Sequence, residues 1–154
     1  MSAFRFPLQK VLEYREQAER ERAKGLAAAR AKSDEAQRAR ADLEALRDAG
    51  RSRLMRAHGS GRTVGHLQNM ALVLDQVDEQ IENAQAACQQ ADEQVVENLK
   101  SYHEAIQQRK TIDQLRERRL DQWKAEEQQR ERKAMDEIAI TRHARSDRTS
   151  AMGG

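Results

Sequence analysis

The stretch HGSGRTVGH, residues 58–66, decides the fold of this 154-residue chain. It holds three of the seven glycines in the chain, and glycine ends helices and lets the backbone turn. Thr63 or Ser60 can cap a following helix. The stretch therefore predicts a hinge between two helical segments. Because a short connection between long helices makes them antiparallel neighbours, we expect a helical hairpin.

The sequence on both sides of the hinge has the composition of long helices. Charged residues make up 35% of the chain, aromatic residues only 3%, and its one proline, Pro7, suits a first helical turn. Apolar and small residues recur at heptad spacing. In a first helix (7–57) the expected interface positions are Leu8, Val11, Arg15, Ala18, Arg22, Gly25, Ala29, Lys32, Ala36, Ala39, Leu43 and Leu46, with Leu12, Leu26 and Leu54 on one flank. In a second helix (67–145) they are Leu67, Met70, Leu74, Val77, Ile81, Ala84, Cys88, Ala91, Val95, Tyr102, Ala105 and Ile112.

These patterns predict an all-α fold of one domain, residues 1–154, in which two long helices form an antiparallel coiled-coil hairpin. Residues 146–154, which are rich in Ser, Thr and Gly, are expected to form a disordered tail. Charge supports the pairing, because residues 1–60 carry 14 basic and nine acidic residues, whereas residues 61–98 carry one and seven. The heptads allow two registers, with Leu8 opposite either Ile112 or Arg119.

In either register the second helix is longer than the first and overhangs it. Phe4 and Phe6 are expected to fold back over only the base of this overhang, near Leu120 and Trp123. Trp123, Met135, Ile138 and Ile140 are expected to have no intramolecular partner along the rest of it. A solvated charged helix is one interpretation, and the pair Glu126–Arg130 has the order that stabilises it. The other interpretation is a docking arm for a partner.

The run MALVLDQV, residues 70–77, is apolar on more faces than one interface uses. Met70 and Val77 are expected to face inward, and Leu72 and Val73 outward. Exposed aliphatic residues are common and can be without function. Alternatively, they form a second docking surface or a contact between two hairpins.

The sequence contains no recognisable catalytic constellation. The hinge lacks the Gly-Lys-Ser/Thr ending of a phosphate loop, the four histidines are scattered, and an open hairpin offers no pocket, so we expect neither an enzyme nor a cofactor or metal site.

No signal peptide or apolar span is recognised and Cys88 is the only cysteine, which suggests a cytoplasmic protein. Nucleic-acid binding through RERR, residues 116–119, is the main rival, although acids interleave with the bases. Membrane binding through FRFPLQKVL, residues 4–12, is a weaker one.

Three features of the sequence are similar to one known family. The opening FRFPLQKVLEYRE places alternating Phe residues before a helix, and the length and single hinge fit along the whole chain. The run WKAEEQQRERKAMDEIA, residues 123–139, contains the pattern E-x-K-x-x-D-E at Glu131, Lys133, Asp136 and Glu137. The chain resembles the flagellar export protein FliJ family of the bacterial flagellar type III secretion apparatus.

The resemblance implies a non-enzymatic stalk of the hexameric export ATPase. Such a stalk also contacts the membrane-embedded export gate and the export chaperones during flagellum assembly, and lies at the cytoplasmic face of the inner membrane. The related stalk proteins of virulence secretion systems are the nearest alternative, and a basic coiled-coil nucleic-acid-binding protein is another. The ATPase-facing residues would be Trp123, Arg130, Glu131, Lys133, Met135, Asp136, Glu137 and Ile138. The gate- or chaperone-facing residues would be Met70, Leu72, Val73 and Val77.

Overall fold

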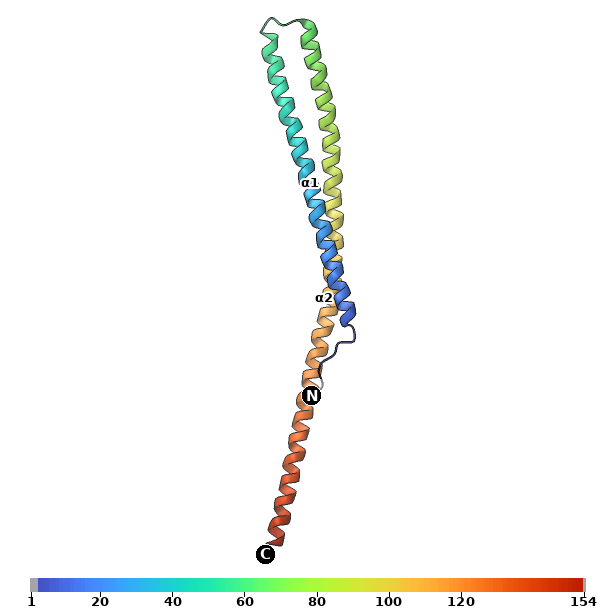
Figure 1. Cartoon of the computed structure of the whole chain (residues 1–154), viewed down its shortest axis with the longest axis vertical. Helices are drawn as coiled ribbons and strands as arrows, with labels where there is room; N and C mark the ends of the chain where they lie inside the picture. Colours follow the sequence, from blue (N-terminus) through green and yellow to red (C-terminus); the bar gives the residue numbers. More distant parts are fainter. Residues whose placement is uncertain (1–2, 154) are drawn as a thin grey trace. The chain divides into compact units, whose positions relative to one another are not determined.

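The computed structural model describes residues 3–153 and contains two helices, α1 (Gln9–His58) and α2 (Val64–Met152) (Figure 1). The helices pack against each other in antiparallel order, and α2 is the longer, with 89 residues against 50. The predicted helical hairpin is confirmed. The chain forms two compact units. The hairpin unit comprises Glu16–Gln107, and the terminal unit combines the N-terminal segment through Arg15 with α2 from Gln108 onward.

The hinge connection is shorter than the sequence pattern predicts. α1 continues to His58 and α2 starts at Val64, so five residues rather than nine connect the helices. Thr63 caps α2, because its hydroxyl oxygen accepts the backbone N–H of His66 at 3.3 Å. Gly61 has a φ of 71°, a left-handed conformation that glycine adopts without strain. These two residues produce the reversal that the glycine-rich stretch predicts.

In the hairpin unit, the interface side of α2 follows the predicted heptads. Val77, Ile81 and Cys88 are buried, with exposed fractions of 4–7%. Leu67, Met70, Leu74, Ala84, Ala91 and Val95 are half-buried in the same frame. The strict heptad repeat in this part of α2 therefore identifies the buried face correctly.

The interface side of α1 is partly offset by one residue from the predicted stripe. Leu26 and Ser33 are buried, and Arg40 and Arg47 are half-buried one and two heptads after Ser33. Large leucines explain the offset, because this frame removes Leu12, Leu26 and Leu54 from water. The predicted interface positions that are exposed instead are Val11, Arg22, Lys32, Ala39 and Leu46.

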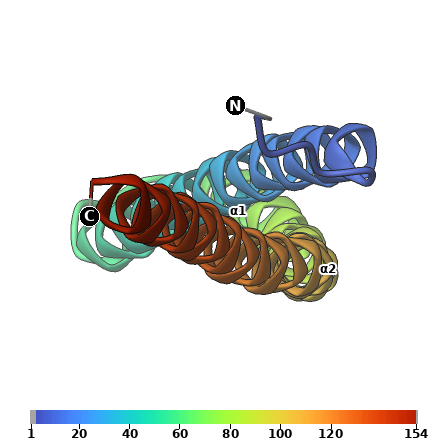
Figure 2. The same cartoon turned by 90° about the horizontal axis from the view of Figure 1, so that it is seen from below.

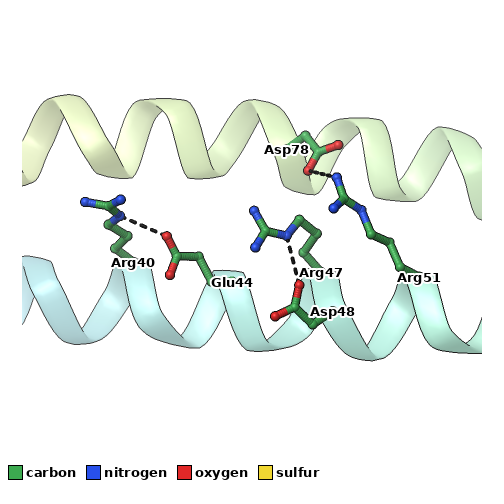
Figure 3. Close-up of polar contacts among 6 residues, drawn as sticks. All are labelled: Arg40, Glu44, Arg47, Asp48, Arg51 and Asp78. Atoms are coloured by element: carbon green, nitrogen blue, oxygen red, sulfur yellow. Dashed lines mark hydrogen bonds and ion pairs between the residues drawn. The ribbon is translucent and has the colours of Figure 1, made fainter.

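Polar side chains occupy the middle of the hairpin interface. The hydroxyl of Ser33 donates to Oδ1 of Asp92 across the interface at 2.7 Å. Further along, Arg51 of α1 pairs with Asp78 of α2 at 3.6 Å, whereas Arg40 and Arg47 pair with carboxylates of α1 itself (Figure 3). The positive and negative arms therefore do contact each other, but much of the arginine charge is balanced within α1.

In the terminal unit, the segment before α1 packs on α2. Residues 3–8, which precede α1, are not helical (Figures 1 and 2). The rings of Phe4 and Trp123 lie 6.1 Å apart, and Phe6 and Leu12 are buried at 8% and 3% exposure. A guanidinium N–H of Arg15 donates to Oε1 of Gln108 at 2.6 Å.

This last contact establishes the register in the terminal unit. One heptad before Arg15 in α1 and one heptad after Gln108 in α2, this register places Leu8 level with Leu115. Leu115 lies between the two predicted positions, Ile112 and Arg119. Both leucines are half-buried. Leu8 and Arg15 keep their predicted interface positions, so the difference arises in α2, where the half-buried Leu115 and Leu120 lie off the predicted heptads.

The last part of α2 also differs from the prediction. The helix continues past residue 145 to Met152, where a disordered tail was expected; the last residue of that tail, Gly154, lies outside the described residues. Threonine hydroxyls hydrogen-bond within the helix: Thr141 donates to the carbonyl of Glu137 and Thr149 to that of Arg145. Ser/Thr content therefore does not end the helix here, because these hydroxyls bond to the backbone of the preceding turn.

Candidate partner-binding surfaces

The C-terminal extension, residues 128–152 of α2, is the first candidate surface. Every residue in it is exposed, and at 1.5 Å per residue it is about 37 Å long. Glu127 is the last half-buried residue before it. None of the described residues of the terminal unit covers this helix, so its stability comes from its own hydrogen bonds and side-chain pairs. Such a helix presents its full circumference to a partner.

Large apolar side chains in the extension are exposed to water. Met135, Ile138 and Ile140 are 70%, 50% and 69% exposed. Ile138 follows Glu127 by eleven residues, about three helical turns, so it continues the line of the half-buried residues. Met135 is three residues from Ile138 and is its neighbour on the helix surface. Ile140 projects from the other side, beside His143 and Ala144.

The charged residues of the extension differ in how far they are paired. Arg130 contacts Glu126 at 3.8 Å and Glu127 at 3.2 Å, which confirms the predicted Glu126–Arg130 pair. The other predicted charged residues are all exposed, and none forms an ion pair within the part of the chain that the structure describes: Glu131, Lys133, Asp136 and Glu137. These four charges remain available for a partner.

Trp123 does not belong to the free extension. It is half-buried, and its ring is tilted by 54° against that of Phe4. The expectation that Trp123 has no intramolecular partner is therefore wrong, whereas the expectation that Phe4 folds back near Trp123 is confirmed. Residues 3–6 are not helical, and a non-helical chain can span more distance per residue than a helix does.

The second candidate surface is the hinge-end groove, which lies between the helices of the hairpin unit. Leu72 and Val73 are 61% and 58% exposed, as predicted, whereas Val77 is buried at 7%. Val77 therefore packs in the hairpin interface, at the inward position that the heptads predict. The groove has a volume of about 360 Å³. Its apolar lining consists of Leu46, Ala49, Gly50, Met70, Val73, Leu74 and Val77.

Leu46 is the residue of this groove that sequence reasoning missed. The heptad pattern places it in the interface, but it is 57% exposed. Gly50, one turn away, lets α2 approach closely: a Cβ atom at this position would lie 2.6 Å from Cδ2 of Leu74. The heptad spacing from Leu26 to Leu54 could have identified Leu46 as exposed. This spacing places Arg47 in the interface, and Leu46, one position earlier, then faces outward.

Neither surface has the chemistry of a catalytic site. Within residues 3–153, no group of three or more His, Cys, Asp or Glu side chains is placed to hold a metal ion. Cys88 is a free thiol, buried between the helices. In the same residues, no helix is long and apolar enough to cross a membrane. The helical hairpin, with exposed apolar and charged side chains on its helices, fits the coiled-coil class.

The comparison with protein families agrees with this class. The model of the flagellar FliJ protein family matches residues 4–148, which is nearly the whole chain. The chain belongs to this family and is a component of the flagellar type III protein export apparatus. Neither a curated protein nor a solved structure matches the chain.

Proposed function

We propose that the chain is the non-enzymatic stalk of the flagellar export ATPase, and that the C-terminal extension is the part that enters the ATPase ring. The single observation that carries this proposal is the exposure of every residue from 128 to 152 on a continuous helix. A ring of subunits needs a slender central partner, and one uncovered α-helix is about 10–12 Å across with its side chains. Apolar anchors and unpaired charges both lie on this helix.

Met135 and Ile138 are the proposed apolar anchors. They continue the line along which the N-terminal segment packs on α2, beyond the contact between Phe4 and Trp123. A subunit of the ring would cover this line on the extension. Burying two such side chains contributes more than a tenfold gain in affinity by transfer free energy alone. Glu131, Lys133, Asp136 and Glu137 would then select the partner and its orientation.

The double variant Met135→Ser/Ile138→Ser is expected to bind purified export ATPase about tenfold more weakly than the unaltered chain. Both side chains are exposed, so the fold should not change. Ile140→Ser is the matched control, because Ile140 is as exposed but projects from the other side. Affinity is measured by biolayer interferometry, and ATP hydrolysis is followed with and without the ATPase. Equal affinities for all variants would contradict the proposal, as would ATP hydrolysis by the chain alone.

We also propose that the hinge-end groove links this stalk to the export gate or to export chaperones. Val73 carries this second proposal, because it is exposed and lines the apolar groove, and Leu72 is an exposed aliphatic residue next to it in the sequence. The protein would thereby lie at the cytoplasmic face of the inner membrane, at the base of the flagellum. ATP hydrolysis in the ring and delivery of flagellar subunits at the gate would be coupled through one molecule.

Leu72→Ser/Val73→Ser is expected to weaken binding of the gate's cytoplasmic domain or of a chaperone by about tenfold, and to leave ATPase binding unchanged. Val96→Ser is the control, since Val96 is 52% exposed on the same helix but lies away from the groove. Both variants are tested by isothermal titration calorimetry against each purified partner. If the double variant and the control bind every partner equally well, the groove is not the linking surface.

A further inference from the structure

The hinge tip, residues 49–66, differs in charge from the rest of the hairpin unit. It contains Arg51, Arg53, Arg56 and Arg62, together with His58 and His66. The sequence has no Asp or Glu from residue 49 to residue 74. In most of the rest of the hairpin unit acidic residues are interleaved with the basic ones; the exception is residues 22–33, with Arg22, Lys24, Arg30 and Lys32. The tip differs from that run in the length of its acid-free stretch and in its place at the end of the hairpin.

Most of this positive charge is not balanced within the protein. Arg51 pairs with Asp78 at 3.6 Å. Arg53, Arg56 and Arg62 form no ion pair with any residue from 3 to 153; Arg56 donates to the backbone carbonyl of Ser52, and Nη1 of Arg62 donates to Nε2 of His66 at 2.7 Å. Neither of these acceptors carries a negative charge. Three guanidinium groups thus remain for an external anion.

Two aliphatic side chains lie among these arginines and are exposed to water. Met55, in the last turn of α1, is 78% exposed, and Val64, the first residue of α2, is 71% exposed. They flank the five-residue connection from the two arms. Neither takes part in the helix–helix interface, so the hairpin fold does not require them to be apolar.

The charges and the aliphatic groups surround the tip rather than gathering on one face. Successive helical residues turn by about 100°, so Arg51 and Arg53 project to nearly opposite sides of α1. Met55 and Val64 come from different helices on either side of the turn. A protein partner that docks on one side would leave half of these groups unused. A planar surface that meets the end of the hairpin would use all of them.

We propose that the hinge tip binds end-on to an anionic phospholipid bilayer. The guanidinium groups would contact lipid phosphates, and Met55 and Val64 would enter the boundary between headgroups and acyl chains. Nucleic acid explains the arginines but not the aliphatic residues, because bases stack on aromatic rings and the tip has no Phe, Tyr or Trp. This surface is separate from the extension but adjoins the hinge-end groove, which Arg53 and His66 line together with Val73. The inference does not depend on the proposed stalk function.

The test measures binding of the full chain to vesicles, without any other protein. Vesicles of phosphatidylcholine with 30 mol% phosphatidylglycerol (about a third anionic, in the range where basic segments bind) are compared with phosphatidylcholine alone by co-sedimentation. The anionic vesicles are expected to bind the chain, and binding should weaken as salt screens the charges. Arg56→Gln/Arg62→Gln should lower the partition coefficient about 25-fold, since each arginine near such a surface contributes about fivefold.

Matched variants separate a specific tip contact from general attraction. Arg30→Gln/Arg38→Gln removes two exposed arginines of α1 far along the chain from the tip and should leave most binding intact. Met55→Ser/Val64→Ser keeps the charge and should still lower binding severalfold. Equal losses in both arginine pairs would overturn the proposal, as would equal binding to neutral vesicles. The proposal would also be overturned if the chain did not bind vesicles but bound a polyglutamate peptide through the tip. That result would indicate that the tip binds an acidic protein surface.

Discussion

Leu26→Ala should lower the free energy of unfolding by about 2–4 kcal/mol, whereas Leu46→Ala should lower it by less than about 1 kcal/mol. The two substitutions are chemically identical and lie in the same helix. Their side chains are 6% and 57% exposed. Removing the buried side chain loses transfer free energy and leaves a cavity, whereas Leu46 already lies mostly in water.

The expected loss at Leu26 is large because the interface contains few bulky side chains. Ala29 and Ser33 are the next buried residues of α1, and they offer little apolar area to compensate. Alanine has a helix propensity close to that of leucine, so the difference reports packing rather than backbone preference. Urea unfolding followed by circular dichroism at several concentrations measures both variants. Similar losses for Leu26→Ala and Leu46→Ala would show that the interface of α1 follows the predicted heptads and not the observed frame.

Ala134→Pro should weaken ATPase binding about 100-fold and leave the unfolding midpoint of the hairpin unchanged. Proline inside a helix removes a hydrogen bond and clashes with the preceding turn, at a cost of about 3 kcal/mol, which corresponds to that factor. Every residue of the extension is exposed, so no tertiary contact holds the helix together around the proline. A partner must then restore the helix in order to bind it.

The control is Ala134→Gln, which alters the side chain at the same place but keeps a good helix former. It should bind like the unaltered chain. A chain that ends at Glu127 is the limiting case, because it retains the contact between Phe4 and Trp123 and lacks only the extension. Affinity is measured by biolayer interferometry and the midpoint by thermal circular dichroism. If Ala134→Pro binds normally, the ATPase contact lies outside the extension; if the midpoint falls, the extension stabilises the hairpin.

The buried face of a helix was predictable where large apolar residues recur in only one heptad frame. Val77, Ile81 and Cys88 follow one heptad frame, so the buried face of α2 is clear. In α1, small residues stand at adjacent positions such as Ala28 and Ala29, and two frames look equally suitable. Only the scattered leucines distinguish these frames, and their burial depends on the partner helix, which a pattern within one helix does not describe.

The candidate surfaces were predictable to different degrees. Exposure of Met135, Ile138 and Leu72 follows from helical geometry once the hairpin is assumed. The half-burial of Trp123 depends on the N-terminal segment, whose path no periodicity predicts; only the two Phe residues before the helix indicated a contact near it. The cationic hinge tip is present in the sequence, but it spans the end of one arm and the start of the next. Charge counts taken arm by arm therefore conceal it.

Gly25 and Gly50 have a consequence for the alignment of the two arms. A Cβ atom at Gly25 would lie 3.1 Å from Oδ1 of Asn98, and one at Gly50 would lie 2.6 Å from Leu74. An alanine-rich interface buries nearly the same area after sliding by one heptad, so burial alone discriminates weakly between alignments. After such a slip Leu74 would meet Leu43 or Ala57 instead of a glycine. The two glycines thus leave space for Asn98 and Leu74 in one alignment of the arms. Steric exclusion, rather than buried area, therefore keeps the arms from sliding.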